Sequence, residues 1–301
     1  IRGTSKGVAV VTDCNGRYVY LNPFKGAQIA VAEAARNISV SGALPNGVTD
    51  CLNFGNPEKP EAFWQFEQAV KGLAEACEAF NAPVISGNVS FYTETPNGTI
   101  FPTPTIGMCG LLEDVSKRMT SDFKNPGDDI YLLSGTPDTV PGFDDLGGSE
   151  YLNCICGLAA GDAPYFDMDD ELRVQECIRE AIDKGLLTCA HDVSDGGLAV
   201  CLAECCIRGG KGAETDYRTA SKPVNALFAE GQSRIVVSAK PEKKEALEAL
   251  CAEKKVELKH LGKVTAGDAF TVKVNGKKQI DQSVKEITAS YRTAVSEYMD
   301  Q

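Results

Sequence analysis

Two short segments of this chain are the most informative: TDCLNFGN at residues 49–56 and ISGNVSFY at residues 85–92. Each places a glycine and small oxygen-bearing side chains at the end of an apolar run. A glycine leaves backbone N–H groups uncovered for a phosphate, and Asp, Asn and Ser offer the hard oxygen ligands that magnesium prefers. The pair of segments therefore predicts two strands that carry one half of a nucleotide-phosphate site.

The candidate binding residues are placed where each strand is expected to stop. Asp50 ends the run Gly47–Thr49, and Gly87 and Asn88 end the run 83–86. The carboxyl ends of strands open onto clefts in sheet-based folds, which favours ligand binding there. Asp and Asn are also common in turns, so the residues alone leave a purely local turn role open.

Size and charge limit the class of protein. The chain has 301 residues and is 43% hydrophobic, which is enough for two domains. Its 30 basic and 42 acidic residues give a formal charge of −12, which argues against nucleic-acid or anionic-membrane partners. An anionic substrate would therefore need a local pocket.

No stretch of the sequence approaches the ~20 apolar residues of a membrane span, and the first residues are not a signal peptide, so we expect a cytoplasmic protein without a membrane partner. The chain starts at Ile1 rather than at a methionine. This start suggests either a segment cut from a longer protein or the loss of a disordered leader.

Twelve cysteines are present, and most lie inside apolar runs, where a reduced thiol packs as a small hydrophobe. The clusters 154–156 and 201–206 contain no Cys-x-x-Cys pair, and the only histidines are His191 and His260. We therefore expect a reduced core without a zinc site. Buried examples are expected at Cys77, Cys109, Cys177 and Cys189.

The first part of the chain mixes both element types. Residues 7–12 and 17–21 are β-rich runs around an Asn-Gly pair, which predicts a hairpin. Helices are expected at residues 28–41 and from Pro57 to residue 80, with strands at 83–85 and 105–112. Periodicity stops between residues 116 and 127, where we place a domain boundary.

The second part again mixes strands and helices, so we predict two α+β domains, residues 1–120 and 121–301. Residues 135–148 are rich in Gly, Pro and Asp and are expected to form a loop. Strands are expected at 129–133, 186–190, 234–238, 257–264 and 270–274, and helices at 170–184, 197–206, 241–254 and 283–298.

The run HDVSDGG at residues 191–197 admits two interpretations. A histidine beside carboxylates is typical of a general base held by an acid. Neighbouring residues on a strand point to opposite faces, so the sequence does not require Asp192 to touch His191. We favour a structural role, in which Ser194 or Asp195 caps the next helix and the glycines permit close backbone approach.

Two further loops, residues 144–150 and 228–234, place acids beside glycines. Such loops bind cations or phosphates, and they also form ordinary solvated turns. The sequence contains neither a Walker motif nor a Gly-x-Ser-x-Gly elbow, so P-loop hydrolysis and serine-esterase chemistry lack support.

These segments resemble the second half of the phosphoribosylformylglycinamidine synthase family, in its small bacterial form. The resemblance extends over nearly the whole chain. It is carried by VTDCNGRYVY (11–20), IAVAEAARN (29–37), TDCLNFGNPEKP (49–60), GNVSFY (87–92), GGSEYL (147–152), HDVSDGGL (191–198) and LFAEGQ (227–232). It implies the aminoimidazole ribonucleotide synthetase fold: an N-terminal α+β domain that pairs with a sister domain, followed by a C-terminal α+β domain.

The resemblance also implies an activity and site roles. In this family ATP phosphorylates the amide oxygen of formylglycinamide ribonucleotide, and glutamine-derived ammonia displaces the phosphate to give the amidine. By resemblance Asp50 and Gly87 contact ATP, Asn88 binds Mg²⁺ and Ser90 contacts the substrate. Ser86 replaces a usual glycine, and Gly231 replaces a common serine.

The catalytic histidine of the family belongs to the first half, so the resemblance implies no catalytic residue here and an inactive isolated chain. Its implied partners are the N-terminal half of the same polypeptide, a glutaminase subunit and a small bridging subunit. A lone half could also pair with itself through its exposed edge. Two alternatives remain: a homodimeric kinase-like relative acting on another small substrate, and a non-catalytic nucleotide-binding module.

Overall fold

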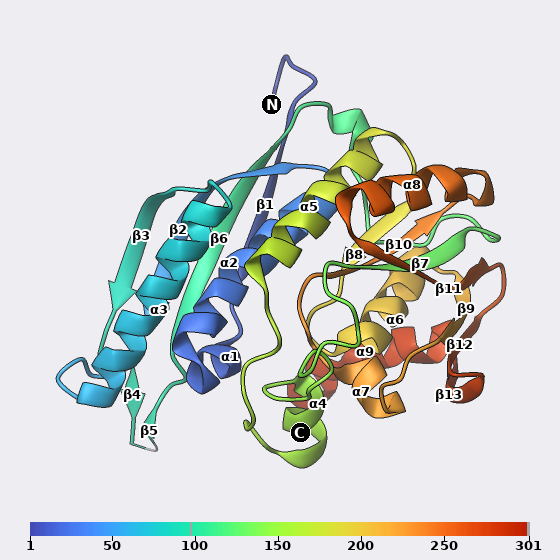
Figure 1. Ribbon diagram of the computed structural model, residues 1–301. Helices are drawn as coiled ribbons and strands as arrows, with labels where there is room; N and C mark the ends of the chain where they lie inside the picture. Colours follow the sequence, from blue (N-terminus) through green and yellow to red (C-terminus); the bar gives the residue numbers. More distant parts are fainter. Residues whose placement is uncertain (97, 300–301) are drawn as a thin grey trace.

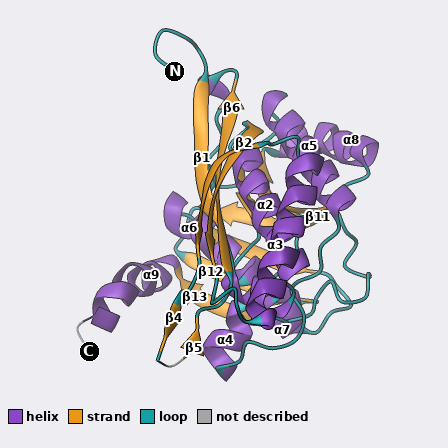
Figure 2. Ribbon diagram, turned by 90° about the vertical axis from the view of Figure 1, so that its left-hand side faces the viewer, coloured by secondary structure: helices purple, strands orange, loops and turns teal. Residues whose placement is uncertain are grey.

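The N-terminal unit is a four-stranded sheet with helices on one face only (Figures 1 and 2). The computed structural model describes residues 1–96 and 98–299. The strand order is β1-β6-β2-β3, in which β2 and β3 are parallel and the other pairs antiparallel. The elements are β1 (Gly7–Asp13), α1 (Gly16–Leu21), α2 (Pro23–Val40), β2 (Leu44–Asn53), α3 (Pro60–Ala79), β3 (Val84–Ser90) and β6 (Thr103–Leu112).

Helices α2 and α3 bury the inner face of this sheet. Asn22 caps α2 by accepting a hydrogen bond from the Lys25 N–H, and Pro23 occupies the first helical turn, where its missing N–H is harmless. The alanine-rich body of α2 lets the helix approach both α3 and the sheet closely. A small hairpin, β4 (Glu94–Thr95) and β5 (Gly98–Thr99), follows β3.

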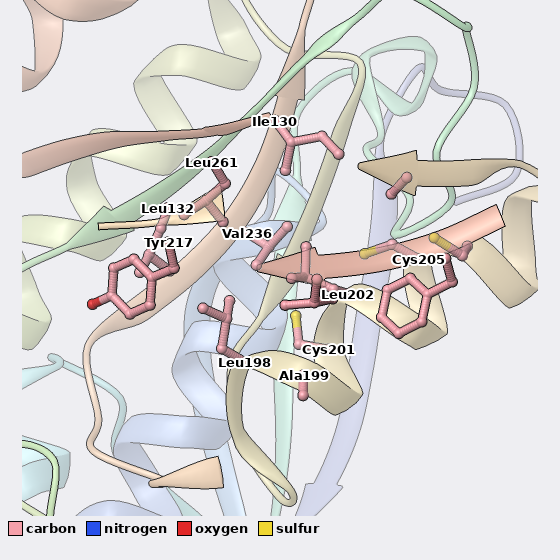
Figure 3. Packing of buried hydrophobic residues seen from close by; sticks show 14 of the residues in the cluster. Ile130, Leu132, Leu198, Ala199, Cys201, Leu202, Cys205, Tyr217, Val236 and Leu261 are labelled. Carbon is pink, nitrogen blue, oxygen red and sulfur yellow. The ribbon is translucent and has the colours of Figure 1, made fainter. Parts of the chain in front are cut away.

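The C-terminal unit is a seven-stranded sheet with helices on both faces. Alternate residues of β7 face opposite sides: Ile130 and Leu132 pack against α6, α7 and α9, whereas Tyr131 and Leu133 pack against α5 and α8. Figure 3 shows the first of these cores, where Leu198 and Leu202 of α6 meet the sheet. The strand order is β13-β12-β9-β11-β7-β10-β8.

The elements of this unit begin after a short 3-10 turn at Val115–Lys117. They are β7 (Asp129–Ser134), α4 (Glu150–Cys156), α5 (Met168–Asp183), β8 (Cys189–Asp192), α6 (Gly197–Gly209), β9 (Gly212–Tyr217), α7 (Pro223–Phe228), β10 (Arg234–Ala239), a 3-10 turn at Pro241–Lys243, α8 (Lys244–Lys254), β11 (Glu257–Thr265), β12 (Ala269–Val274), β13 (Lys277–Ser283) and α9 (Val284–Met299). The predicted loop at 135–148 contains no helix or strand. Helices α4 and α7 and strands β9 and β13 were not predicted.

The predicted N-terminal hairpin is wrong. Residues 16–21 form helix α1, because the Asn15 side chain accepts a hydrogen bond from the Arg17 N–H and so caps a helical turn. Tyr18 and Val19 are then buried against α2. Strand β1 pairs instead with β6, about a hundred residues later in the chain.

Several predicted boundaries also shift. Helix α3 starts at Pro60 rather than at Pro57. Both prolines suit a first helical turn, so the sequence alone does not choose between them. Strand β3 continues to Ser90, because the parallel ladder with β2 extends to the pair Asn53 and Ser90. Asp50, Gly87 and Asn88 therefore lie inside strands and not at their ends.

All twelve cysteines are free thiols. Cys77, Cys177 and Cys189 are buried as predicted, whereas Cys109 is only partly buried. None of the helices in the described part of the chain has both the length and the apolar character that a membrane crossing needs.

Candidate functional site

Asp50 and Gly87 are direct neighbours across the parallel strands β2 and β3. A Cβ atom at position 87 would lie 2.2 Å from Oδ1 of Asp50, so a side chain there would push this carboxylate out of its present position. The Asn88 backbone N–H donates a hydrogen bond to the same carboxylate. Burial raises the pKa of Asp50, and this hydrogen bond opposes the shift.

Asn88 and Ser90 lie on the opposite face of the sheet from Asp50. The Asn88 side-chain amide donates to Oγ of Ser90 at 3.0 Å, and Oγ of Ser86 lies 2.8 Å from Oγ1 of Thr49. Residues 86, 88 and 90 share one face of the strand because side chains alternate. The structure thus brings the four predicted site residues onto two adjacent strands, but divides them between the two faces.

The outer face of the four-stranded sheet is apolar at one end and polar at the other. The register places Val8, Leu111 and Leu44 in one row, and Val10 in the next row with Cys109. The following rows carry hydroxyl and amide groups at Thr12, Thr49, Ser86, Thr105 and Asn88. We call this surface the open sheet face.

The apolar end of the open sheet face is exposed. Val10 is 76% exposed and Ile85 is 71% exposed, values that are high for such side chains. A shallow hollow of about 200 Å³ is lined there by Val10, Ile85, Thr49 and Cys109, among others. This end of the face has the character of a protein contact surface.

The donor set on β2 and β3 is small for a metal ion. No group of three or more His, Cys, Asp or Glu side chains in the described residues is arranged to hold one. Mg²⁺ often takes only one or two protein ligands and completes its octahedron with phosphates and waters. The Asn88 side-chain oxygen fits that pattern, provided that a phosphate ligand brings most of the coordination.

A second polar cluster, which the sequence did not reveal, lies between the two units. We call it the domain seam: Asp13, Glu33, Arg36 and Asn37 of the N-terminal unit against Glu171, Asp192, Asp195 and Gln232 of the C-terminal unit. Arg36 is fully buried; its Nη1 donates to Glu171 Oε2 at 2.8 Å and its Nη2 to Gln232 Oε1 at 2.7 Å. The available signal was the placement of two charges, Glu33 and Arg36, inside the alanine-rich body of α2.

Acidic side chains outnumber basic ones in the domain seam. The Asn37 amide lies 3.4 Å from Oδ2 of Asp13 and 3.5 Å from Oδ2 of Asp192, and so bridges the two units. Burial, and then repulsion from Asp192, raises the pKa of Asp13 to about 8, although Arg36 acts in the opposite direction. Burial also raises the pKa of Glu33 well above its usual value.

The acid-and-glycine loops 144–150 and 228–234 meet at Glu230, so neither is a solvated turn. Oε1 of Glu230 accepts hydrogen bonds from the backbone N–H of Gly196 at 2.6 Å and of Glu150 at 2.8 Å, and Tyr18 donates its hydroxyl to Oε2. Burial raises the pKa of Glu230 to about 7, although these hydrogen bonds act to lower it. Glu230 therefore fastens three segments from both units together.

His191 is held in a structural ion-pair network. Its Nε2 lies 2.6 Å from Glu204 Oε2 and its Nδ1 lies 3.3 Å from Asp192 Oδ1, so the two neighbours do touch. Burial disfavours the imidazolium, but Cys201, Asp192 and Glu204 together raise the pKa of His191 to about 11. A permanently charged imidazolium is a poor general base at neutral pH.

The expected side-chain cap of α6 is wrong, since its N-cap is Gly196 and Asp195 accepts from Asn15 instead. The expected close backbone approach is confirmed. A Cβ atom at position 197 would lie 2.7 Å from the Ala229 carbonyl oxygen.

The PurL subunit of phosphoribosylformylglycinamidine synthase from Thermoanaerobacter pseudethanolicus is 46% identical over 300 residues, which are 100% of this chain and 40% of the relative. The corresponding subunit of Salinibacter ruber is 48% identical over 298 residues, which are 98% of this chain and 39% of the relative. The chain thus spans about two fifths of the length of these curated relatives.

Solved structures share the fold. T. maritima PurL complexed with FGAR superposes with a TM-score of 0.79 at 18% identity, covering 94% of this chain and 46% of that one. A thiamine-monophosphate kinase from Stenotrophomonas maltophilia gives a TM-score of 0.65 at 18% identity, covering 93% and 88%. The model for the AIR synthase related protein N-terminal domain matches residues 1–112, and that for the C-terminal domain matches residues 125–275. The chain therefore belongs to the AIR synthase related protein family, with its N-terminal and C-terminal domains in order.

Proposed function

We propose that this chain supplies part of an ATP-dependent phosphoribosylformylglycinamidine synthase. The reaction converts formylglycinamide ribonucleotide, glutamine and ATP to the amidine, glutamate, ADP and phosphate, with glutamine as the amide donor. Identity of 46% along the whole chain to a PurL subunit is the observation that carries this proposal. The PurL fold and the clustering of candidate ligands on β2 and β3 support it.

The proposed roles follow the two faces of the β2–β3 pair. Asp50 and Gly87 contact ATP, because the carboxylate lies against a strand that lacks a side chain at that position. Ser90 contacts the ribonucleotide from the polar end of the open sheet face, next to Asn88. The amide hydrogen bond from Asn88 orients the Ser90 hydroxyl toward an acceptor on the substrate.

Asn88 is the proposed Mg²⁺ ligand, through its side-chain oxygen. When bound, magnesium offsets the charge that develops on the phosphates during transfer. The remaining ligands would come from ATP, from water and from acidic residues outside this chain. This division agrees with the small donor set on β2 and β3.

The chain alone is proposed to be inactive. Of its two histidines, His191 is locked between Glu204 and Asp192, and His260 lies 3.2 Å from Asp129 on the far unit. Neither stands beside Asp50 or Asn88 in a position to move a proton. The base is therefore proposed to come from the N-terminal half of the polypeptide, which would cover the open sheet face. A glutaminase subunit and a small bridging subunit would complete the assembly.

A second candidate function is a homodimeric kinase-like enzyme. The thiamine-monophosphate kinase match favours it, because this chain covers 88% of that protein's length. Such an enzyme would bind ATP and transfer phosphate without any further half. A non-catalytic module would instead bind ATP and transfer nothing.

One experiment separates these readings. ATP binding is measured by calorimetry, and amidine formation is measured with ammonium chloride as nitrogen donor, first for this chain alone and then with the N-terminal half of the Thermoanaerobacter relative added. We expect turnover only in the mixture. Turnover by the chain alone would contradict the proposed half-enzyme, and ATP binding without rescue would favour the non-catalytic module.

Matched variants test the site itself. Asp50→Ala should weaken ATP binding by at least about tenfold in the mixture, as expected for the loss of a charged contact. Asp281→Ala, on the exposed strand β13, should leave binding unchanged. If Asp50→Ala binds ATP as the parent does, Asp50 is not a ligand.

A further inference from the structure

Two buried thiols meet between α5 and α8, the two helices that lie side by side on one face of the large sheet (Figure 1). The sulfur atoms of Cys177 and Cys251 are 3.9 Å apart. Both side chains are essentially inaccessible, with exposed fractions of 0% and 1%. The two cysteines are 74 residues apart in sequence, so contact between them links distant parts of the C-terminal unit.

An ion-pair cluster fixes the two helices beside this thiol pair. Lys254 of α8 lies 2.7 Å from Glu176 Oε1 and 2.9 Å from Glu180 Oε2 of α5. Glu176 precedes Cys177 directly, and Lys254 follows Cys251 by less than one turn. The helices therefore hold the two sulfurs 3.9 Å apart, compared with about 2.05 Å between the sulfurs of a disulfide.

The two thiols are chemically unequal. The hydrogen bond with Cys251 lowers the pKa of Cys177, and the positive charge of Lys254 acts in the same direction against burial. The same hydrogen bond, followed by burial, raises the pKa of Cys251. Because the positive charge of Lys254 favours a thiolate at Cys177, we assign Cys177 as the thiol that meets the oxidant and Cys251 as the thiol that resolves the product.

We propose that Cys177 and Cys251 are a reversible redox pair that crosslinks α5 to α8 in response to hydroperoxide. The Cys177 thiolate attacks one oxygen of hydrogen peroxide, the O–O bond breaks and hydroxide leaves, which forms a sulfenic acid. The Cys251 sulfur then attacks the Cys177 sulfur, and the sulfenic oxygen leaves as water with the Cys251 proton. Two thiols and one peroxide yield one disulfide and two waters, and a dithiol reductant reverses the change.

Hydrogen peroxide is the proposed oxidant because it is close to water in size, so a small local opening between α5 and α8 would admit it and still exclude larger disulfides. The crosslink would also bear on the domain seam, since α5 supplies residues to it from another side of the same helix. Glu171 accepts from Arg36, and Gln175 donates to the Ala32 carbonyl oxygen at 2.9 Å. Oxidation would thus fix the helix that holds the two units together.

The test treats the whole chain with hydrogen peroxide, blocks remaining thiols under unfolding conditions and maps peptides without reductant. We expect a linked peptide pair joining Cys177 and Cys251, and a rise in Tm of at least about 5 °C that a dithiol reverses. Cys251→Ser should abolish both changes and leave Cys177 to oxidise further to sulfinic acid. Cys206→Ser, another buried cysteine, should keep the linked pair.

Two results would overturn the proposal. One is recovery of Cys177 and Cys251 as blockable thiols after peroxide has oxidised the exposed Cys154 and Cys156. The other is a rise in Tm that persists in Cys251→Ser. The first result comes from peptide mapping of the peroxide-treated parent chain, so it does not depend on whether any variant folds.

Discussion

At the scale of single residues, the contact between Asp50 and Gly87 shows how glycine is favoured at a position whose backbone is ordinary strand. The restriction comes from a neighbour, since any Cβ atom would overlap the Asp50 carboxylate. Gly87→Ala would therefore displace the side chain proposed to contact ATP. The same variant leaves the strand's own conformational preferences nearly unchanged, apart from a gain in rigidity.

Asp13 makes stability depend on pH. Its folded pKa is about 8 and its ordinary value is 3.8, so the folded state holds this proton more tightly than the unfolded state does. The contribution of Asp13 is thus most favourable below about pH 4 and declines as pH rises toward 8. Asp13→Asn should remove this decline, so its stability relative to the parent should rise by about 3–4 kcal/mol between pH 5 and pH 8.

Urea unfolding of the parent and of Asp13→Asn at pH 5, 6, 7 and 8 measures the difference. Asp281→Asn is the control, because Lys278 lowers the pKa of Asp281 and the site is exposed. Parallel stability curves for the parent and Asp13→Asn would show that Asp13 is ionised in the folded chain throughout this range.

At the scale of elements, sequence periodicity located the long helices and the strands β7, β10, β11 and β12, but it missed the interior strand β9. Helix α5 begins within two residues of its predicted start, because its apolar stripe and the Asp167 cap agree. The segment 16–21 was misread because its aromatic and branched residues favour strands locally, whereas a cap and a tertiary contact decide the structure. Helix α4 carries no buried residue, so it leaves no periodic signal.

The candidate site was predictable only in part. The small residues of β2 and β3 could be recognised as ligand-bearing, but their division between two faces depends on strand register, which extends beyond both motifs. The domain seam joins residues more than a hundred positions apart, such as Arg36 and Glu171. No local pattern encodes such a contact.

The packing of α2 on α3 depends on Gly72. A Cβ atom there would lie 2.2 Å from the Phe24 carbonyl oxygen, which is backbone and cannot rotate away. Gly72→Ala should therefore destabilise the chain by about 2–4 kcal/mol, even though alanine favours an isolated helix by about 1 kcal/mol.

Chemical denaturation of Gly72→Ala against Lys71→Ala gives the comparison. Lys71 is exposed on the same helix and forms a surface ion pair with Glu67, so its loss should cost no more than about 0.5 kcal/mol. If Gly72→Ala is as stable as the parent or more stable, α2 and α3 move apart without a free-energy penalty.

At the scale of the whole molecule, the two units differ most in how their sheets are covered, because the open sheet face has no helices on it in the described part of the chain. The large sheet is covered on both sides, whereas the small one exposes Val8, Val10, Leu44 and Ile85. We expect the isolated chain to self-associate through this face at micromolar concentrations. The double variant Val10→Lys with Ile85→Lys should be monomeric by analytical ultracentrifugation.

Ile155→Lys provides the control, because Ile155 is 68% exposed on α4, outside the open sheet face. A parent chain that remains monomeric at high concentration, or a dimer that Ile155→Lys disrupts, would place the contact elsewhere.

Strand β3 is the outermost strand of its sheet and has a ladder partner on one side only. Such strands open locally at low free-energy cost, so their amide protons exchange before those of the interior. The strand proposed to hold Asn88 and Ser90 is therefore the one that ligands must first order. A partner seated on the open sheet face would order it in advance, and nucleotide would then bind more tightly. If the proposed site and the proposed assembly both hold, assembly and nucleotide affinity would be thermodynamically linked through one edge strand.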